Sequence, residues 1–133
     1  MKYLAVPYNM ISTPIYAADG TLYEVIAPGC FDLSRPVPLV RGHVRNRRDW
    51  IVGRVQCFSD ERGVYFEFEG ELPANFSGFS VRFKPLRWRR IGPQTIRLIE
   101  AKLRHIALLT KPDSPVYPST FSQMKGSKYG HSC

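Results

Sequence analysis

The sequence has few cysteines, few acidic residues and no long apolar run. Its three cysteines, Cys30, Cys57 and Cys133, lack the Cys-x-x-Cys spacing, which argues against a disulfide framework and against a zinc ribbon. No apolar stretch approaches the roughly 20 residues that cross a bilayer, and the first residues reach Pro7 too soon for a secretory signal. These absences predict a soluble, cytosolic protein without a membrane partner.

The shortage of acidic residues leaves a strongly basic chain. Nineteen Lys and Arg residues stand against 11 Asp and Glu residues, a net charge of +8. Much of this charge falls into two groups: Arg41, Arg45, Arg47, Arg48 and Arg54 in the first, and Arg82, Lys84, Arg87, Arg89 and Arg90 in the second. Such charge favours acidic partners, but it does not choose between nucleic acid and an acidic protein surface.

What is present is enough for one packed domain. The 133 residues are 44% hydrophobic, and a chain of this length buries roughly two-thirds of its unfolded surface. We expect a single domain over residues 1–118. Residues 119–133 form a tail rich in Ser, Lys and Gly, a composition typical of disorder.

Short β-rich runs separated by turn signals dominate the domain. The expected strands are Lys2–Tyr8, Thr21–Ala27, Val37–Gly42, Ile51–Phe58, Val64–Leu72 and a run centred on Phe79–Phe83. Residues 9–20 are expected as loop, Cys30–Arg35 as a single helical turn and Lys84–Pro93 as a basic connection. Thr95–Leu109 fits a helical stripe and a strand face equally well. The pattern predicts a mainly β fold (α+β at most): a small antiparallel barrel of roughly six to seven strands with little helix.

One hydroxyl and two imidazoles stand out as candidate chemistry. Ser80 lies beside the Ser77-Gly78 pivot, on the polar side of a run whose apolar positions alternate with it. His43 and His105 are the only histidines outside the tail, which holds His131. A catalytic serine needs a base to take its proton and a third group to orient that base. The residues alone leave open that Ser80 is an ordinary strand serine and His105 a core histidine.

Other assignments of the same residues also stay open. Asp49 and Glu100 are rival third members, and Cys30 would be a nucleophile if a helix N-terminus lowered its thiol pKa. A metal site built from Cys30, His43, Cys57 and His105 lacks ligand spacing, so we expect no metal and no cofactor. The stretch 87–90 (RWRR) resembles an aromatic-interleaved nucleic-acid patch, but such stretches are more often solvated loops.

Five stretches, in order, resemble the tailed-phage prohead (capsid maturation) proteases. Residues 77–83 (SGFSVRF) are similar to that family's S-G-M-S-F-G-F nucleophile strand, and residues 39–43 (LVRGH) with 51–54 (IVGR) resemble its histidine motif and the strand after it. The other likenesses are residues 24–32 (EVIAPGCFD) to E-x-I-x-P-G-A-F, 60–67 (DERGVYFE) to D-x-x-G-L-x-F, and 103–112 (LRHIALLTKP) to L-x-E-V-S-x-V-x-x-P-A. The likeness spans about residues 3–118.

The resemblance implies a fold and a triad. The family has a β barrel related to herpesvirus assemblin, which favours strand for Thr95–Leu109. Ser80 matches the nucleophile and His43 the general base. The third position, usually glutamate in the phage enzymes, is His105 here, and the herpesvirus proteases use a comparable Ser-His-His arrangement. The family's helix before the nucleophile strand is replaced here by the short stretch Glu71–Ser77.

The resemblance also implies a function. The expected activity is that of a serine endopeptidase that cleaves scaffold and major capsid precursor proteins. The resemblance leaves open whether the protein also cleaves itself and whether it forms a homo-oligomer. The expected place is the host cytoplasm, inside the assembling procapsid, and nucleic acid is not the expected partner. The alternative is a non-catalytic capsid-assembly or scaffold-binding relative. A third reading is a basic barrel that binds nucleic acid through Arg82–Arg90.

Overall fold

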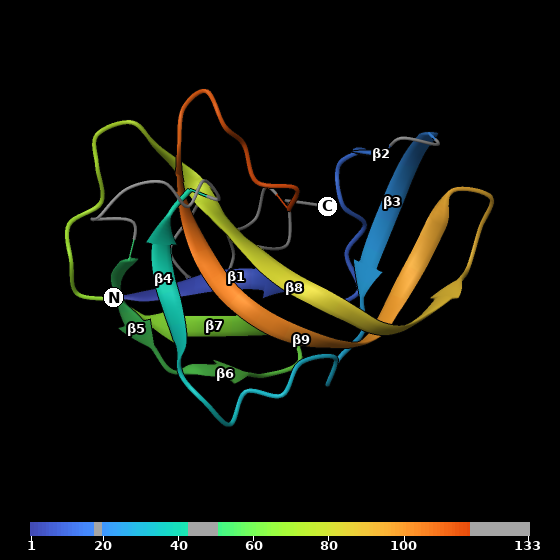
Figure 1. Cartoon of the computed structure of the whole chain (residues 1–133), viewed down its shortest axis with the longest axis horizontal. Helices are drawn as coiled ribbons and strands as arrows, with labels where there is room; N and C mark the ends of the chain where they lie inside the picture. Colours follow the sequence, from blue (N-terminus) through green and yellow to red (C-terminus); the bar gives the residue numbers. More distant parts are fainter. Residues whose placement is uncertain (18–19, 43–50, 118–133) are drawn as a thin grey trace.

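The structure is a computed structural model of the chain, and it describes residues 1–17, 20–42 and 51–117. Among these residues there are strands and no helix (Figure 1). The strands are β1 (Lys2–Pro7), β2 (Ile15–Ala17), β3 (Gly20–Ile26), β4 (Val37–Arg41), β5 (Ile51–Val55), β6 (Cys57–Ser59), β7 (Gly63–Glu67), β8 (Phe76–Arg90) and β9 (Thr95–Thr110). The predicted mainly β class is confirmed.

The strands form two sheets, and the long strand β9 organises the larger one. The smaller sheet has the order β1-β7-β6 and is antiparallel. In the larger sheet, β8 pairs antiparallel with β9 along one edge, while β3 and then β4 run parallel to β9 along the other. Neither sheet closes into the predicted barrel, and the parallel pairs depart from the antiparallel arrangement expected from the sequence.

Aromatic side chains pack between the two sheets. The ring of Phe79, fully buried on β8, lies 5.1 Å from that of Tyr3, 4.9 Å from Phe66 and 5.0 Å from Phe76. Tyr3 belongs to β1 and Phe66 to β7, so these contacts hold the long hairpin against the smaller sheet. Tilted and edge-on ring pairs at such distances add to the free energy gained from burial.

The β8–β9 hairpin corrects two expectations at once. Residues 84–90, expected as a connection, continue β8 to Arg90, and the chain turns at 91–94, where the N–H of Ile91 donates to the carbonyl of Thr95. Thr95–Leu109 is a strand because β8 satisfies its backbone groups along nearly its whole length. Figure 1 shows the hairpin curving across the molecule.

Other elements differ from the sequence-based expectation in their bounds. Cys30–Arg35 is not a helical turn, because Phe31 forms a bridge with Ala101, whose N–H donates to the carbonyl of Cys30. The expected strand Ile51–Phe58 divides at Gln56, whose amide donates to the carbonyls of Leu33 and Cys57. The short strand β2 lies within the stretch expected as loop.

Candidate functional site

Ser80 lies on the face of β8 opposite the aromatic core. Phe79 is fully buried in that core, so alternation along the strand directs Ser80 to the other face, where its side chain is half-buried. Gly78 begins this regular stretch with a φ of 145°, a value that favours glycine. A register shift between Phe76 and Gly78 makes Ser77 the extra residue of a bulge. The Ser77-Gly78 pivot predicted from the sequence is therefore present.

The β8–β9 register brings Ser80 and His105 onto one face. Ser80 pairs with Ala107, and Arg82 pairs with His105. Directly paired residues of antiparallel strands point to the same side, so Ser80 and His105 are diagonal neighbours, with Cα atoms roughly 7–8 Å apart. His105 is only 5% exposed.

Diagonal neighbours suit the two outer members of a catalytic triad better than they suit a direct hydrogen bond between Ser80 and His105. In a serine–base–orienter triad the base stands between the hydroxyl and the orienting group, so the two outer members do not contact each other. Ala107, opposite Ser80, has only a methyl side chain. The placement of Ser80 and His105 as diagonal neighbours on one face is compatible with the two outer positions of such a triad.

Strand β4 approaches the same face from the other edge of β9. Val40 pairs with Ala107, which places Val40, Ala107 and Ser80 in one row across three strands. The N–H of Gly42 donates to the carbonyl of Leu108 at 3.0 Å, with Gly42 in the left-handed region at φ 67°. The predicted base His43 is the next residue and lies outside the described part of the chain, as do Asp49 and His131.

Glu100, the other rival third member, is far from Ser80. It lies seven positions (107 − 100) before Ala107 on β9, which is more than about 20 Å along a strand. Its carboxylate is exposed and lies 3.8 Å from the Nε of Arg87. Glu100 therefore does not serve a triad that contains Ser80.

Cys30 does not have the character of a nucleophile. It is 1% exposed and lies at no helix N-terminus. Burial, with the nearby carboxylates of Glu24 and Glu100, raises the pKa of its thiol to about 12, and burial raises the pKa of Cys57 to about 11. Both thiols are therefore protonated at neutral pH. Within residues 1–17, 20–42 and 51–117 no group of His, Cys, Asp and Glu side chains is placed to hold a metal ion.

A buried carboxyl–phenol pair was missed at the sequence level. Tyr117 donates a hydrogen bond to the Oε1 of Glu24 at 2.9 Å, and the Oγ of Ser12 accepts one from the Glu24 N–H at 2.9 Å. Glu24 and Tyr117 are 8% and 4% exposed, and burial raises the pKa of the Glu24 carboxyl, opposed in part by the Tyr117 hydrogen bond. The signal was a glutamate inside an otherwise apolar run (LYEVI), since a buried acid needs a partner.

We expect Glu24→Gln to stabilise the protein at neutral pH by an amount of the order of 1 kcal/mol. The glutamine carbonyl can still accept from Tyr117, and no charge needs to be buried. The pKa of the Glu24 carboxyl is higher in the folded protein than its ordinary value of 4.5. The stability that the neutral carboxyl contributes is therefore fully present below pH 4.5, and it is lost as the pH rises through the folded-state pKa. The gain of the variant should therefore be small at low pH and grow toward neutral pH.

The measurement is urea denaturation of both proteins across this pH range. Glu67→Gln, at an exposed position on β7, is the matched control and should change stability little at any pH. A Glu24→Gln gain that stays constant with pH would contradict the assignment of a buried, titrating carboxyl.

Comparisons with protein-family models, with curated proteins and with solved structures found no match to this chain. The described residues contain no helix that is both long and apolar enough to cross a membrane. Function is therefore argued from the residues and their geometry.

Proposed function

We propose that the protein is a serine endopeptidase of the prohead maturation type. Ser80 attacks the scissile carbonyl, His43 takes the proton from its hydroxyl and returns it to the leaving amine, and His105 orients His43. The substrates are scaffold and major capsid precursor proteins inside an assembling procapsid. The fold relation to the assemblin-type barrel is part of this proposal.

The diagonal placement of Ser80 and His105 on one face of the β8–β9 ladder carries the proposal. Two residues that matched the family's nucleophile and third position in separate motifs are diagonal neighbours on one face of the ladder. Strand β4 supports the proposal too, because it runs along β9 to Leu108 and ends at Arg41, two residues before His43 in the sequence.

His105 acts here as a positioning residue. A neutral imidazole can accept the N–H of the base and so fix its tautomer and direction. It stabilises the developing imidazolium less than a carboxylate would, because it carries no negative charge. A slower enzyme than one with a glutamate in this position is the consequence.

Co-expression with the coat and scaffold precursors tests the function. We expect precursors shortened at defined peptide bonds, identified by intact-mass spectrometry, and full-length precursors when they are expressed alone. Soluble, folded protein that leaves all precursors at full length would reject the proposed activity.

The second candidate function is a non-catalytic capsid-assembly or scaffold-binding relative. One observation favours it: residues 68–75, between β7 and β8, contain no helix and close with a turn in which the N–H of Phe76 donates to the carbonyl of Pro73. A shortened link of this kind is compatible with a surface that binds precursors without cleaving them. Binding of uncleaved precursors by the wild-type protein would support this candidate over the first.

A further inference from the structure

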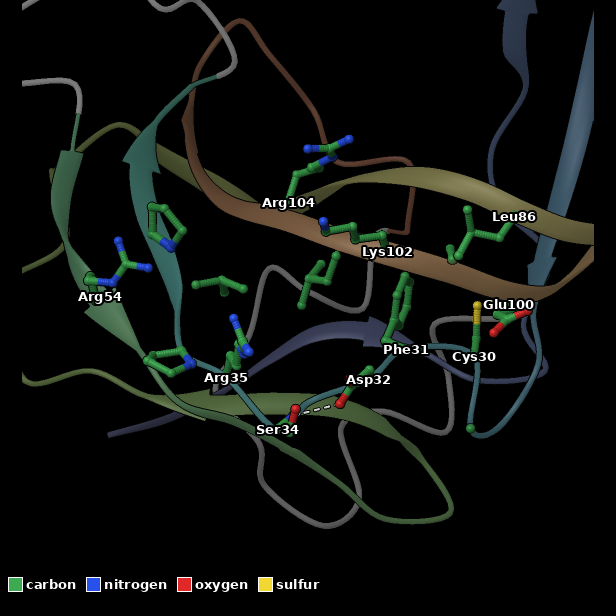
Figure 2. A pocket seen from close by; sticks show the side chains of 16 residues that line it. Cys30, Phe31, Asp32, Ser34, Arg35, Arg54, Leu86, Glu100, Lys102 and Arg104 are labelled. Carbon is green, nitrogen blue, oxygen red and sulfur yellow. Dashed lines mark hydrogen bonds between the residues drawn. The ribbon is translucent and has the colours of Figure 1, made fainter.

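A cavity of about 640 Å³ opens beside the middle of β9 (Figure 2), and Ser80 is not among the residues that line it. The segment 29–38 forms one wall and residues 100–104 of β9 form the other. Arg54 from β5 and Leu86 from β8 complete the lining. Its volume falls in the range of sites that hold small molecules or parts of a peptide.

The cavity exists because β3 and β4 leave part of the β9 edge unpaired. The chain after β3 makes one bridge, Phe31 with Ala101, and β4 begins pairing only at Ile106. Pro36 and Pro38 have no N–H to donate. The carbonyl of Leu33 accepts instead from the Gln56 amide at 2.6 Å. Within the described residues, no strand pairs with this side of β9 at Lys102–Arg104.

Among the described residues, four cationic side chains surround the cavity, and they come from three separate segments. They are Arg35, Arg54, Lys102 and Arg104, all exposed. The lining also contains two carboxylates, and both have other partners. Hydrogen bonds from the side chain of Ser34 and from its N–H, the latter at 3.0 Å, lower the pKa of Asp32, and Glu100 lies near Arg87. The cavity therefore keeps an excess of positive charge beside an apolar wall that includes Phe31 and Val37.

We propose that this cavity binds an extended acidic peptide segment of a partner protein, with at least two carboxylates placed among the four cations. The N–H of Ala101 faces this edge of β9. The N–H of Leu103, two residues further along the strand, faces the same edge and can pair with an extended chain. Arginine side chains bind carboxylates in a bidentate manner. The binding site goes beyond the proposed peptidase activity and does not depend on it.

Two other occupants fit the observations less well. Residues 119–133 of this chain carry Lys125 and Lys128 and no acidic residue, so the cations would repel them. Single-stranded nucleic acid binds by stacking bases on exposed aromatic rings. In the part of the chain that the structure describes, the lining contains one aromatic residue, Phe31, which is 6% exposed and already packs against Phe83 at 5.7 Å.

The test is fluorescence anisotropy of a labelled octapeptide with alternating glutamates, titrated with the full-length protein at low ionic strength. Arg35→Glu combined with Lys102→Glu should weaken binding by at least about tenfold, because it places like charges against the peptide carboxylates at two positions that line the cavity. The control is Arg62→Glu combined with Arg89→Glu, which makes a charge change of the same size at exposed positions outside the cavity. The control should weaken binding by no more than about threefold.

Three results would overturn the inference. The first is an equal loss of peptide affinity in both double variants, and the second is equal affinity for the acidic peptide and for the same peptide with glutamine in place of glutamate. The third is a single-stranded oligonucleotide that binds more tightly than the acidic peptide and whose binding the cavity substitutions abolish. If the charge-reversed cavity variant fails to fold by circular dichroism, Arg35→Gln combined with Lys102→Gln takes its place, with the same expected order. The assay measures binding and not cleavage. Its result therefore does not depend on whether the proposed triad is active.

Discussion

Ser80→Ala is expected to lower the rate of precursor cleavage by about 10⁴-fold or more, the size of effect seen when the nucleophile of a serine–base pair is removed. The hydroxyl has no substitute on this face of β8, since its direct cross-strand partner is Ala107. Stability should change by less than about 0.5 kcal/mol, because Ser80 is half-buried and the substitution is small. Cleavage is followed by the decay of intact precursor in co-expressing cells and with purified protein.

Ser77→Ala is the matched control, three residues earlier on the same strand. The Oγ of Ser77 is buried without a hydrogen-bond partner among the described residues, so its removal should leave both the rate and the fold intact. Equal processing by wild-type protein and Ser80→Ala would show that Ser80 is not the nucleophile.

Phe79→Ala is expected to cost about 3–5 kcal/mol of the free energy of unfolding. Phe79 is fully buried and contacts rings from both sheets, so a cavity left there removes packing on two sides. Guanidinium denaturation followed by circular dichroism measures the loss. Phe79→Leu, which removes fewer contacts, should lose less and serves if the alanine variant does not fold.

Phe58→Ala provides the comparison for Phe79. Phe58 lies on β6, is partly exposed, and among the described residues has one ring contact, with Tyr65 at 4.2 Å. Phe58→Ala should lower the free energy of unfolding by less than half as much as Phe79→Ala, because less of the Phe58 ring is buried. Equal costs at the two positions would contradict a core centred on Phe79 between the sheets.

Local alternation was enough to predict most strands but not their assembly. Val64 and Phe66 are fully buried on a strand that the sequence predicted, and β4 starts at Val37, where the sequence predicted it to start. The extent of β8 was missed because residues 84–90 carry exposed charges on a strand whose stability comes from pairing with β9. β3 and β4 pair with residues of β9 that are far away in the sequence. Neither short strand has a local residue pattern that predicts this parallel pairing.

The candidate site could be predicted only in part, for the same reason. The alternation around Phe79 predicted which way Ser80 points, whereas its proximity to His105 depends on the register of β8 against β9. The cationic cavity was not predicted, because Arg35, Arg54 and Lys102 are far apart in the sequence and meet only through the pairing of β4, β5 and β9. Of the described members of the two arginine-rich groups noted in the sequence, Arg54 is the one that lines it.

The most direct test of the account is covalent labelling of the purified protein with a fluorophosphonate, which reacts with activated serines. The proposed triad predicts one phosphonyl adduct, located by peptide mass spectrometry on Ser80, that forms far more slowly in His105→Ala and is absent in Ser80→Ala. An unlabelled Ser80 in folded protein, or a label on Ser80 whose rate is indifferent to His105, would contradict the account.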